Sequence, residues 1–166
     1  MTLRDDLKDH MPALRRYAHA LCGNAADAED LFQDSLERAL ANERSWHGTN
    51  LKAWLFTLMT NRHRSMLRAR KSRPSGAPLT DAEHLPSGES PSDPHERDRI
   101  VKALGLISEE GRATLLLVVL EGYSYAEVAN ILDVPIGTIM SRLSRARRQL
   151  SEILKGDNIL PMRSRR

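Results

Sequence analysis

The stretch that decides the fold is SYAEVANILDVPIGTIMSRLSRARRQL, residues 124–150. Ser124 and Glu127 have the spacing of a capping box, in which each side chain accepts a backbone N–H of the other residue at the start of a helix. Apolar residues continue with helical spacing to Leu132, and Pro135 marks the start of a second helix. Two helices joined by so short a turn predict a helix-turn-helix.

The second of these helices is basic and has no acidic residue until Glu152. Arginine can bond guanine with two hydrogen bonds, serine and threonine can reach bases or phosphates, and a glycine lets backbone amides approach a phosphate. The alternative is a solvated basic face on an ordinary helix, but the capped helix and the tight turn before it favour DNA. The candidate DNA-reading residues on its outward face are Gly137, Thr138, Ser141, Arg142, Arg145 and Arg148, with Arg145 as the best candidate for reading a base.

Upstream of this motif lies a segment with the composition of a linker. Five of the eight prolines fall between Arg73 and Ile100, among Ser, Gly and acidic residues and almost no large apolar residue. About 25 residues of extended chain reach roughly 80 to 90 Å, enough to hold two domains at separate sites. We therefore divide the chain into a first domain, a flexible acidic linker, a helix-turn-helix domain and a basic tail, with the bounds 1–73, 74–98, 99–155 and 156–166.

The first domain is predicted to contain three helices and no strand. Pro12 is expected to break or restart the first helix. Asn24 is expected to cap the second, whose acidic first turn suits the helix dipole. A loop around Trp46 leads to the third helix, and its predicted inward face is Leu51, Trp54, Leu55, Leu58, Arg62 and Met66. The predicted fold class is all-α, with two small helical domains joined by the linker.

Charge differs sharply between the second and third helices. Residues 53–73 contain six Lys and Arg residues and no Asp or Glu, which is typical of a segment that binds phosphate. Within it, Asn61, Ser65 and Arg68 have helical spacing and form a polar stripe. We interpret the opposed charges as two faces, an acidic one toward a basic protein surface and a basic one toward DNA. The alternative for the basic segment is a solvated helix end.

Residues 121–150, EGYSYAEVANILDVPIGTIMSRLSRARRQL, resemble region 4 of the extracytoplasmic-function sigma factors, small members of the sigma-70 superfamily. DAEDLFQDSLERAL at 27–40 and LKAWLFTLMTNRHRSMLRAR at 51–70 resemble region 2. The resemblance implies that the helix-turn-helix residues read the minus-35 promoter element and that this domain touches the flap of RNA polymerase. Met140 stands where the family often has Lys or Arg, and Ser65 replaces a common Asp.

For the first domain the resemblance implies two further sites. The acidic helix would dock on the polymerase clamp helices through Asp27, Asp30, Gln33 and Asp34. Flipped bases of the minus-10 element would be captured by Trp46, His47, Asn61, Arg64, Ser65 and Arg68, whereas Trp54 is expected in the core. The acidic linker would occupy a nucleic-acid channel of polymerase, the alternative being a solvated spacer. Such proteins bind core RNA polymerase and promoter DNA and are typically controlled by an anti-sigma factor. GTNLKAWLFTLMTN at 48–61 is reminiscent of the general-stress-response subgroup of alphaproteobacteria.

Other functional classes find little support in the sequence. The six histidines are scattered and no phosphate-binding glycine loop or nucleophile motif occurs, so we expect no enzyme, no catalytic residue, no small-molecule substrate, no metal site and no cofactor. Cys22 is the single cysteine and no apolar run reaches roughly 18 residues, which favours a cytoplasmic protein without membrane insertion. Two alternatives remain: a DNA-binding regulator that acts without polymerase, and a sigma-like decoy that binds an anti-sigma protein without promoting transcription.

Overall fold

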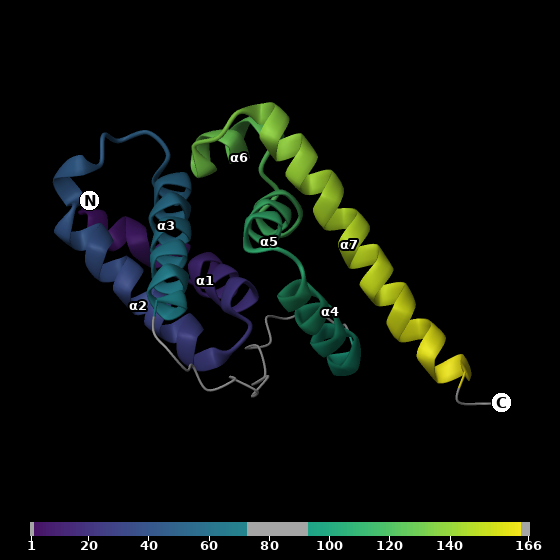
Figure 1. Cartoon of the computed structure of the whole chain (residues 1–166). Coiled ribbons are helices and arrows are strands. Elements are labelled where there is room, and N and C mark those ends of the chain that lie inside the picture. The colour runs from purple at the N-terminus through teal and green to yellow at the C-terminus, as the bar shows by residue number, and fades with distance from the viewer. Residues whose placement is uncertain (1, 73–92, 164–166) are drawn as a thin grey trace. The chain divides into compact units, whose positions relative to one another are not determined.

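A computed structural model of the chain describes residues 2–72 and 93–163, with side chains up to residue 156. These residues form helices joined by short loops, and no strand occurs among them (Figure 1). The chain divides into two compact units, Met1–Leu85 and Pro86–Arg166, called unit 1 and unit 2 below. The predicted all-α fold with two small helical domains is confirmed.

Unit 1 consists of helices α1 (Leu3–Cys22), α2 (Ala25–Ala41) and α3 (Leu51–Lys71), which pack against one another. The side chain of Asn24 accepts a hydrogen bond from the backbone N–H of Asp27 at 2.9 Å, so the predicted cap of α2 is confirmed. A short 3-10 helix, η1 (Glu43–Ser45), lies in the connection between α2 and α3 (Figure 1).

Pro12 lies inside α1 without ending it, so the predicted break is wrong. Proline removes one backbone donor from a helix and crowds the preceding turn, which normally favours a kink or an end. Here Leu7 on one side of Pro12 and Leu14 and Tyr17 on the other are all buried. Packing of both halves against the same core compensates for the missing hydrogen bond.

The core of unit 1 is centred on Tyr17 and Phe56. Their rings meet edge to face, with centroids 4.9 Å apart, a favourable aromatic geometry. The hydroxyls of Tyr17 and Thr60 lie 2.8 Å apart and share a hydrogen bond, and Thr60 also donates to the carbonyl of Phe56 at 2.7 Å. These bonds allow both hydroxyls to be buried at low cost.

The predicted inward face of α3 is wrong by one residue over most of its length. Leu55 is buried as predicted, but Trp54, Leu58, Arg62 and Met66 are only half-buried. The side chains that α3 buries are Leu55, Phe56, Met59, Thr60 and His63. Apolar residues occupy two adjoining stripes of this helix, so periodicity alone does not show which stripe is buried. The polar residue Thr60 lies in the buried stripe because its hydroxyl is hydrogen-bonded there.

Unit 2 consists of α4 (Pro94–Leu106), α5 (Glu109–Leu115), a π-helical segment η2 (Leu116–Leu120), α6 (Tyr125–Leu132) and α7 (Ile136–Arg163). Helix α7 packs against α4, α5 and α6. The predicted helix-turn-helix consists of α6 and α7, and the Ser124–Glu127 capping box is present. Asp133 ends α6 in the left-handed region, with φ of 53°, and thereby turns the chain toward Pro135.

Two segment boundaries differ from the prediction. Helix α4 begins at Pro94, inside the predicted linker, because the Asp93 side chain accepts the N–H of His95 at 3.0 Å and proline suits a first helical position. Residues 73–92, and with them the proposed channel contact of the linker, lie outside the described residues. Helix α7 continues to Arg163, through much of the predicted tail.

No helix in the described parts of the chain has an apolar stretch long enough to cross a bilayer. In the same parts, the His, Cys, Asp and Glu side chains form no group of three or more that could hold a metal ion. Cys22, the single cysteine of the chain, is half-buried at the end of α1.

Candidate nucleic-acid interface

The first turns of α7 are positioned by close packing against α5. Ile139, Leu143 and Ala146 form the buried side of α7. Gly111 of α5 lies so near that a Cβ atom on it would come within 3.2 Å of the Ala146 Cβ and 2.9 Å of the Ser108 Oγ. Ser108 caps α5 by accepting the N–H of Gly111 at 3.2 Å. A glycine therefore sets how closely the two helices approach.

Arg112 fixes the preceding helix to the same framework. Its Nε donates to the carbonyl of Leu104 at 2.7 Å, and its Nη2 lies 3.2 Å from the carbonyl of Ile107 and 3.3 Å from that of Gly105. The last carbonyls of a helix lack partners within the helix, so a guanidinium satisfies them and complements the helix dipole. Arg112 thus caps the end of α4.

The outward side of α7 carries most of the predicted DNA-reading residues. We call Gly137, Thr138, Ser141, Arg145 and Arg148 the reading face; all are exposed except Thr138, which is half-buried. Ser141 donates to the carbonyl of Thr138 at 3.1 Å, and the Nε of Arg145 lies 3.4 Å from the carbonyl of Ser141. A Cβ atom on Gly137 would meet nothing within 4 Å, so the fold itself does not require glycine there.

Arg142 was predicted on this outward face, and the structure places it elsewhere. Only 15% of its side chain is exposed, and its Nη2 lies 3.6 Å from the Glu110 Oε2 of α5. Its position in the helix is adjacent to Leu143, on the flank that turns toward α5. Arg142 therefore links α7 to α5, the helix that supports it.

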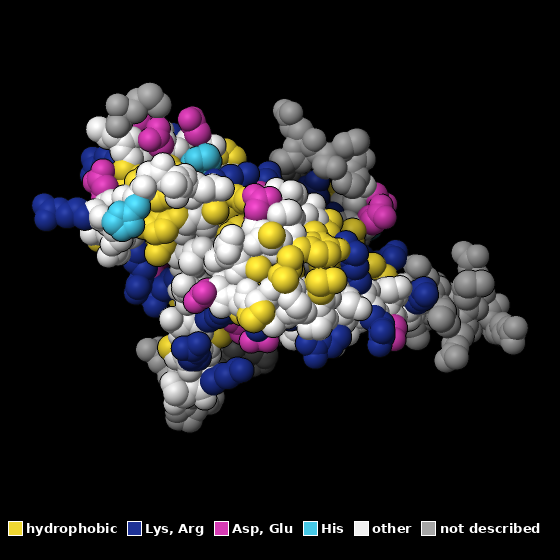
Figure 2. Space-filling view, turned by 90° about the horizontal axis from the view of Figure 1, so that it is seen from above, with side chains coloured by type: hydrophobic (Ala, Val, Ile, Leu, Met, Phe, Trp, Pro, Cys, Tyr) yellow, Lys and Arg dark blue, Asp and Glu magenta, His cyan; other side chains and the backbone are white. Residues whose placement is uncertain are grey.

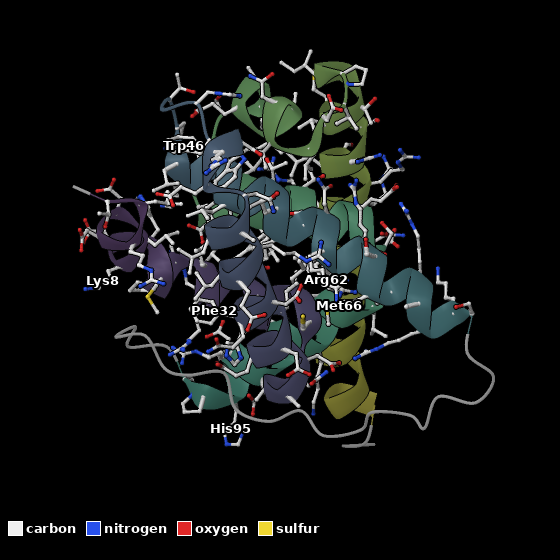
Figure 3. The ribbon with its side chains drawn as sticks, turned by 90° about the vertical axis from the view of Figure 1, so that its left-hand side faces the viewer. Lys8, Phe32, Trp46, Arg62, Met66 and His95 are labelled. Atoms are coloured by element: carbon white, nitrogen blue, oxygen red, sulfur yellow. The ribbon has the colours of Figure 1, made fainter. Side chains whose placement is uncertain are left out.

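In unit 1, two tryptophans face each other beside the start of α3. Trp46, labelled in Figure 3, directly follows η1. Its ring centroid lies 5.6 Å from that of Trp54, with the planes tilted by 38°. Both rings are half-buried, so the expectation that Trp54 belongs to the core is wrong. These residues, the tryptophan pair, are the two tryptophans of the whole chain. His47 beside them is exposed.

The tryptophan pair lies at one end of the predicted polar stripe. Asn61, Ser65 and Arg68 are all exposed, and Arg64 is half-buried. Trp54 precedes Asn61 by two helical turns and so lies on the same side of α3. This spacing is the signal that could have assigned Trp54 to the surface, because it continues the polar stripe rather than the buried side of the helix.

Basic and acidic side chains of unit 1 meet instead of facing apart. Asp27 of α2 is ion-paired with Arg70 of α3, and Asp34 is ion-paired with Arg62 of α3 (Arg62 is labelled in Figure 3). Asp34 also lies 2.9 Å from Arg38. Part of the opposed charge is therefore paired between α2 and α3, which pack side by side. Of the four residues predicted to bind polymerase, Asp30 and Gln33 are exposed.

Asp27 has the best defined electrostatic environment among these groups. The Arg70 guanidinium hydrogen-bonds its carboxylate, and the Asn24 amide donates to it at 2.8 Å. These contacts lower the pKa of Asp27 from its ordinary value although its side chain is only 14% exposed, and the same pair raises the pKa of Arg70. The hydrogen bonds outweigh the cost of burial, so Asp27 holds α2 to the end of α3 as a charged group.

Two family descriptions match the chain, one in each unit. "Sigma2 domain of PhyR" matches residues 7–60, and "Sigma-70, region 4" matches residues 97–150. The first match spans α1, α2 and the first half of α3. The second spans α4 to the first half of α7 and includes the reading face.

The similar proteins span nearly the whole chain. The ECF RNA polymerase sigma factor EcfG of Rhodopseudomonas palustris strain TIE-1 is 41% identical over 157 residues, which cover 94% of this chain and 87% of the relative. SigE of Mycolicibacterium smegmatis, also an ECF sigma factor, is 31% identical over 89% of this chain and 60% of the relative. Among solved structures, the sigma factor RpoE in complex with the anti-sigma factor NepR from Bartonella quintana is 35% identical, with a TM-score of 0.75, and the match covers 92% of this chain and 96% of that one.

Proposed function

The chain belongs to the extracytoplasmic-function sigma factors, and we propose that it binds core RNA polymerase and directs promoter-specific initiation by reading minus-10 and minus-35 elements. The observation that carries this proposal is the presence of both modules, a sigma region 2 domain and a sigma region 4 domain, in this order on one chain. A regulator that only binds an operator needs the second module and not the first.

Minus-35 recognition is assigned to the reading face of α7. In helix-turn-helix proteins the first residues of the second helix contact base edges in the major groove. Arg145 is exposed with its Nε turned toward the preceding turn, and Arg148 lies one turn further on. The open space around Gly137 supports an approach of DNA phosphate to the backbone amides at the start of α7. Arg142 acts indirectly in this proposal, by holding α7 to α5.

Minus-10 recognition is assigned to the tryptophan pair and the polar stripe. Bases extruded from a duplex need stacking surfaces, and single strands are held by aromatic and basic side chains together. Trp46 and Trp54 supply two neighbouring rings that are partly exposed. His47, Asn61 and Ser65 supply hydrogen-bonding groups, while Arg64 and Arg68 supply positive charge for the backbone.

Polymerase binding is assigned to the outer surface of α2. Asp30 and Gln33 are exposed there, ready to meet the clamp helices. Asp27 and Asp34 are predicted contacts as well, but their carboxylates are already paired with arginines of α3. A basic polymerase surface would have to share or replace these arginines.

Control by an anti-sigma factor in a stress response is the last part of the proposal. It rests on the similar RpoE, whose structure was solved in complex with the anti-sigma factor NepR, and on the match to the sigma2 domain of PhyR. The protein would act in the cytoplasm, where polymerase and promoters are found. Purified NepR-type anti-sigma factor from the same organism should abolish initiation at micromolar concentration or below, and undiminished initiation would contradict this part.

Run-off transcription tests the central proposal. Purified chain is added to core RNA polymerase with a library of promoters in which both elements are randomised. We expect initiation from a defined subset that depends on the chain. Sequence-specific duplex binding by the chain alone, with no initiation in the presence of polymerase, would support the polymerase-independent regulator instead. Binding of an anti-sigma factor without initiation would support the decoy.

A further inference from the structure

The first turns of α7 carry two large apolar side chains that the fold leaves in solvent. Ile136 is 49% exposed and Met140 is 54% exposed, whereas the apolar residues that pack α7 into unit 2, such as Ile139 and Leu143, are buried. Figure 2 looks onto the end of unit 2 at which α6 and α7 meet, and it shows hydrophobic side chains gathered there with basic side chains beside them. We call Ile136 and Met140 the apolar flank.

The apolar flank is continuous with the reading face. Ile136 and Met140 are four residues apart, so their side chains are neighbours on the helix surface. Gly137 directly follows Ile136, and Ser141 directly follows Met140. The flank therefore lies within the first two turns of α7, the part of a helix-turn-helix that reaches base edges.

The charged side chains near the apolar flank indicate what kind of partner binds there. The exposed side chains that follow it on α7 include Arg145, Arg147 and Arg148, and no acidic side chain occurs from Ile136 to Ser151. An apolar surface bordered by arginines fits a partner that offers negative charge and apolar groups within a few ångströms. The major groove offers both, because phosphates line it and the C5-methyl group of thymine projects into it.

We propose that Ile136 and Met140 read thymine methyl groups in the major groove of the minus-35 element, so that this chain prefers an A·T pair at the positions they face. This inference rests on the proposed function. A methyl group buried against these side chains favours thymine over a base without it by about fourfold, the factor for removing one such group from water. Methionine suits this task because its flexible side chain adapts to the position of the methyl group.

The test removes the methyl group and nothing else. The library experiment first yields a promoter that the wild-type holoenzyme uses, and each thymine of its minus-35 element is then replaced by uracil, one at a time. We expect one or two of these replacements to lower run-off from the wild-type holoenzyme by about two- to fourfold. With Met140→Ala, uracil and thymine should give equal run-off at the position that Met140 faces, whereas a position faced by Ile136 should keep its wild-type difference.

Leu106→Ala is the matched control, because Leu106 is a 72% exposed apolar side chain of unit 2 on α4, away from the apolar flank. For this variant, the ratio of run-off from each thymine promoter to run-off from its uracil counterpart should equal the wild-type ratio, even if its overall activity differs. If no uracil replacement changes run-off from the wild-type holoenzyme, the inference is wrong. It is also wrong if the Met140→Ala variant keeps the wild-type ratio of thymine to uracil run-off at every position. A selected minus-35 element without any preferred A·T pair would overturn it too. Absence of initiation from every unmodified library promoter would overturn the proposed function, and this inference with it.

Discussion

Arg145 is the residue whose surroundings best suit a base-specific contact. It is exposed on the reading face and has no acidic partner within the described part of unit 2. We expect Arg145→Ala to weaken discrimination at one minus-35 position by about 1 to 3 kcal/mol, because a bidentate contact with guanine is lost. Run-off from promoters that vary at each minus-35 position measures this. An equal loss on all promoters would assign Arg145 to phosphate.

Asp27 makes the stability of unit 1 depend on pH. Since contact with Arg70 lowers its pKa below the ordinary 3.8, the ion pair contributes fully above that value and is lost as the pH falls through the folded-state pKa. Asp27→Asn should therefore cost roughly 0.5 to 1.5 kcal/mol at pH 7 and have a smaller effect at pH 3.

Tryptophan fluorescence measures this change selectively, because both tryptophans lie in unit 1. Urea unfolding at pH 7, 4.5 and 3 gives the free energies of unfolding. Asp30→Asn is the matched control, since Asp30 is exposed on the same helix and should leave both the stability and its pH dependence nearly unchanged. Equal losses for Asp27→Asn at pH 7 and pH 3 would contradict the electrostatic explanation.

At the level of helices, the contact between α5 and α7 depends on Gly111. An added methyl group would lie 3.2 Å from the Ala146 Cβ and 2.9 Å from the Ser108 Oγ, so the helices or the cap must shift. We expect Gly111→Ala to destabilise unit 2 by about 1 to 3 kcal/mol, the usual cost of overpacking, and to weaken minus-35 recognition.

Thermal unfolding followed by circular dichroism measures the effect of Gly111→Ala. Gly105→Ala is the control in α4, because a Cβ atom there would meet nothing within 4 Å and alanine favours helix by up to about 1 kcal/mol. A Gly111→Ala variant as stable as Gly105→Ala would show that the close approach is not strained by the added methyl group.

The tryptophan pair joins the end of η1 to the first turns of α3. If it stacks on extruded bases, a single strand with the minus-10 sequence should quench the intrinsic fluorescence of the chain. Trp54→Ala should weaken this binding by about 1 to 3 kcal/mol, the usual contribution of stacking on one base. Lys71→Ala, a basic surface residue at the end of α3, should weaken it only modestly and equally for a scrambled strand. Equal quenching by both strands with wild-type protein would argue against a minus-10 site here.

For the whole molecule, the two units are expected to fold independently. Each has its own buried core, around Tyr17 and Phe56 in unit 1 and around Leu117 and Ile139 in unit 2. Fragments 1–72 and 93–166 should each be helical, and their circular dichroism spectra should add up to that of the intact chain.

The two fragments mixed at micromolar concentration should support initiation at least about 100-fold less than the intact chain. The reason is that covalent linkage gives each unit a millimolar effective concentration at its promoter site. Full activity of the mixture would show that the linker contributes nothing to initiation. A fragment that is unfolded alone would contradict the division into independent units.

Short-range features were predictable from the sequence. Asn24, Ser124 and Glu127 cap helices within three residues of themselves, and Asp133 and Pro135 mark a turn between two adjacent helices. Such interactions depend on the local backbone and on little else, so the residue types identify them. The helix-turn-helix, the three helices of unit 1 and most of the exposed reading face follow from them.

What the sequence alone determined is therefore the set of helices and the chemistry on them, and the tertiary structure decided which side of each helix meets a neighbour. Two adjoining apolar stripes on α3 have the same period, and only packing against α1 selected Phe56 and Thr60 for the core and left Trp54 beside Trp46. Likewise, the ion pair of Asp27 and Arg70 joins residues 43 positions apart, and Arg142 of α7 contacts Glu110 of α5. Periodicity records spacing along one helix, whereas these contacts depend on how separate helices are placed in space.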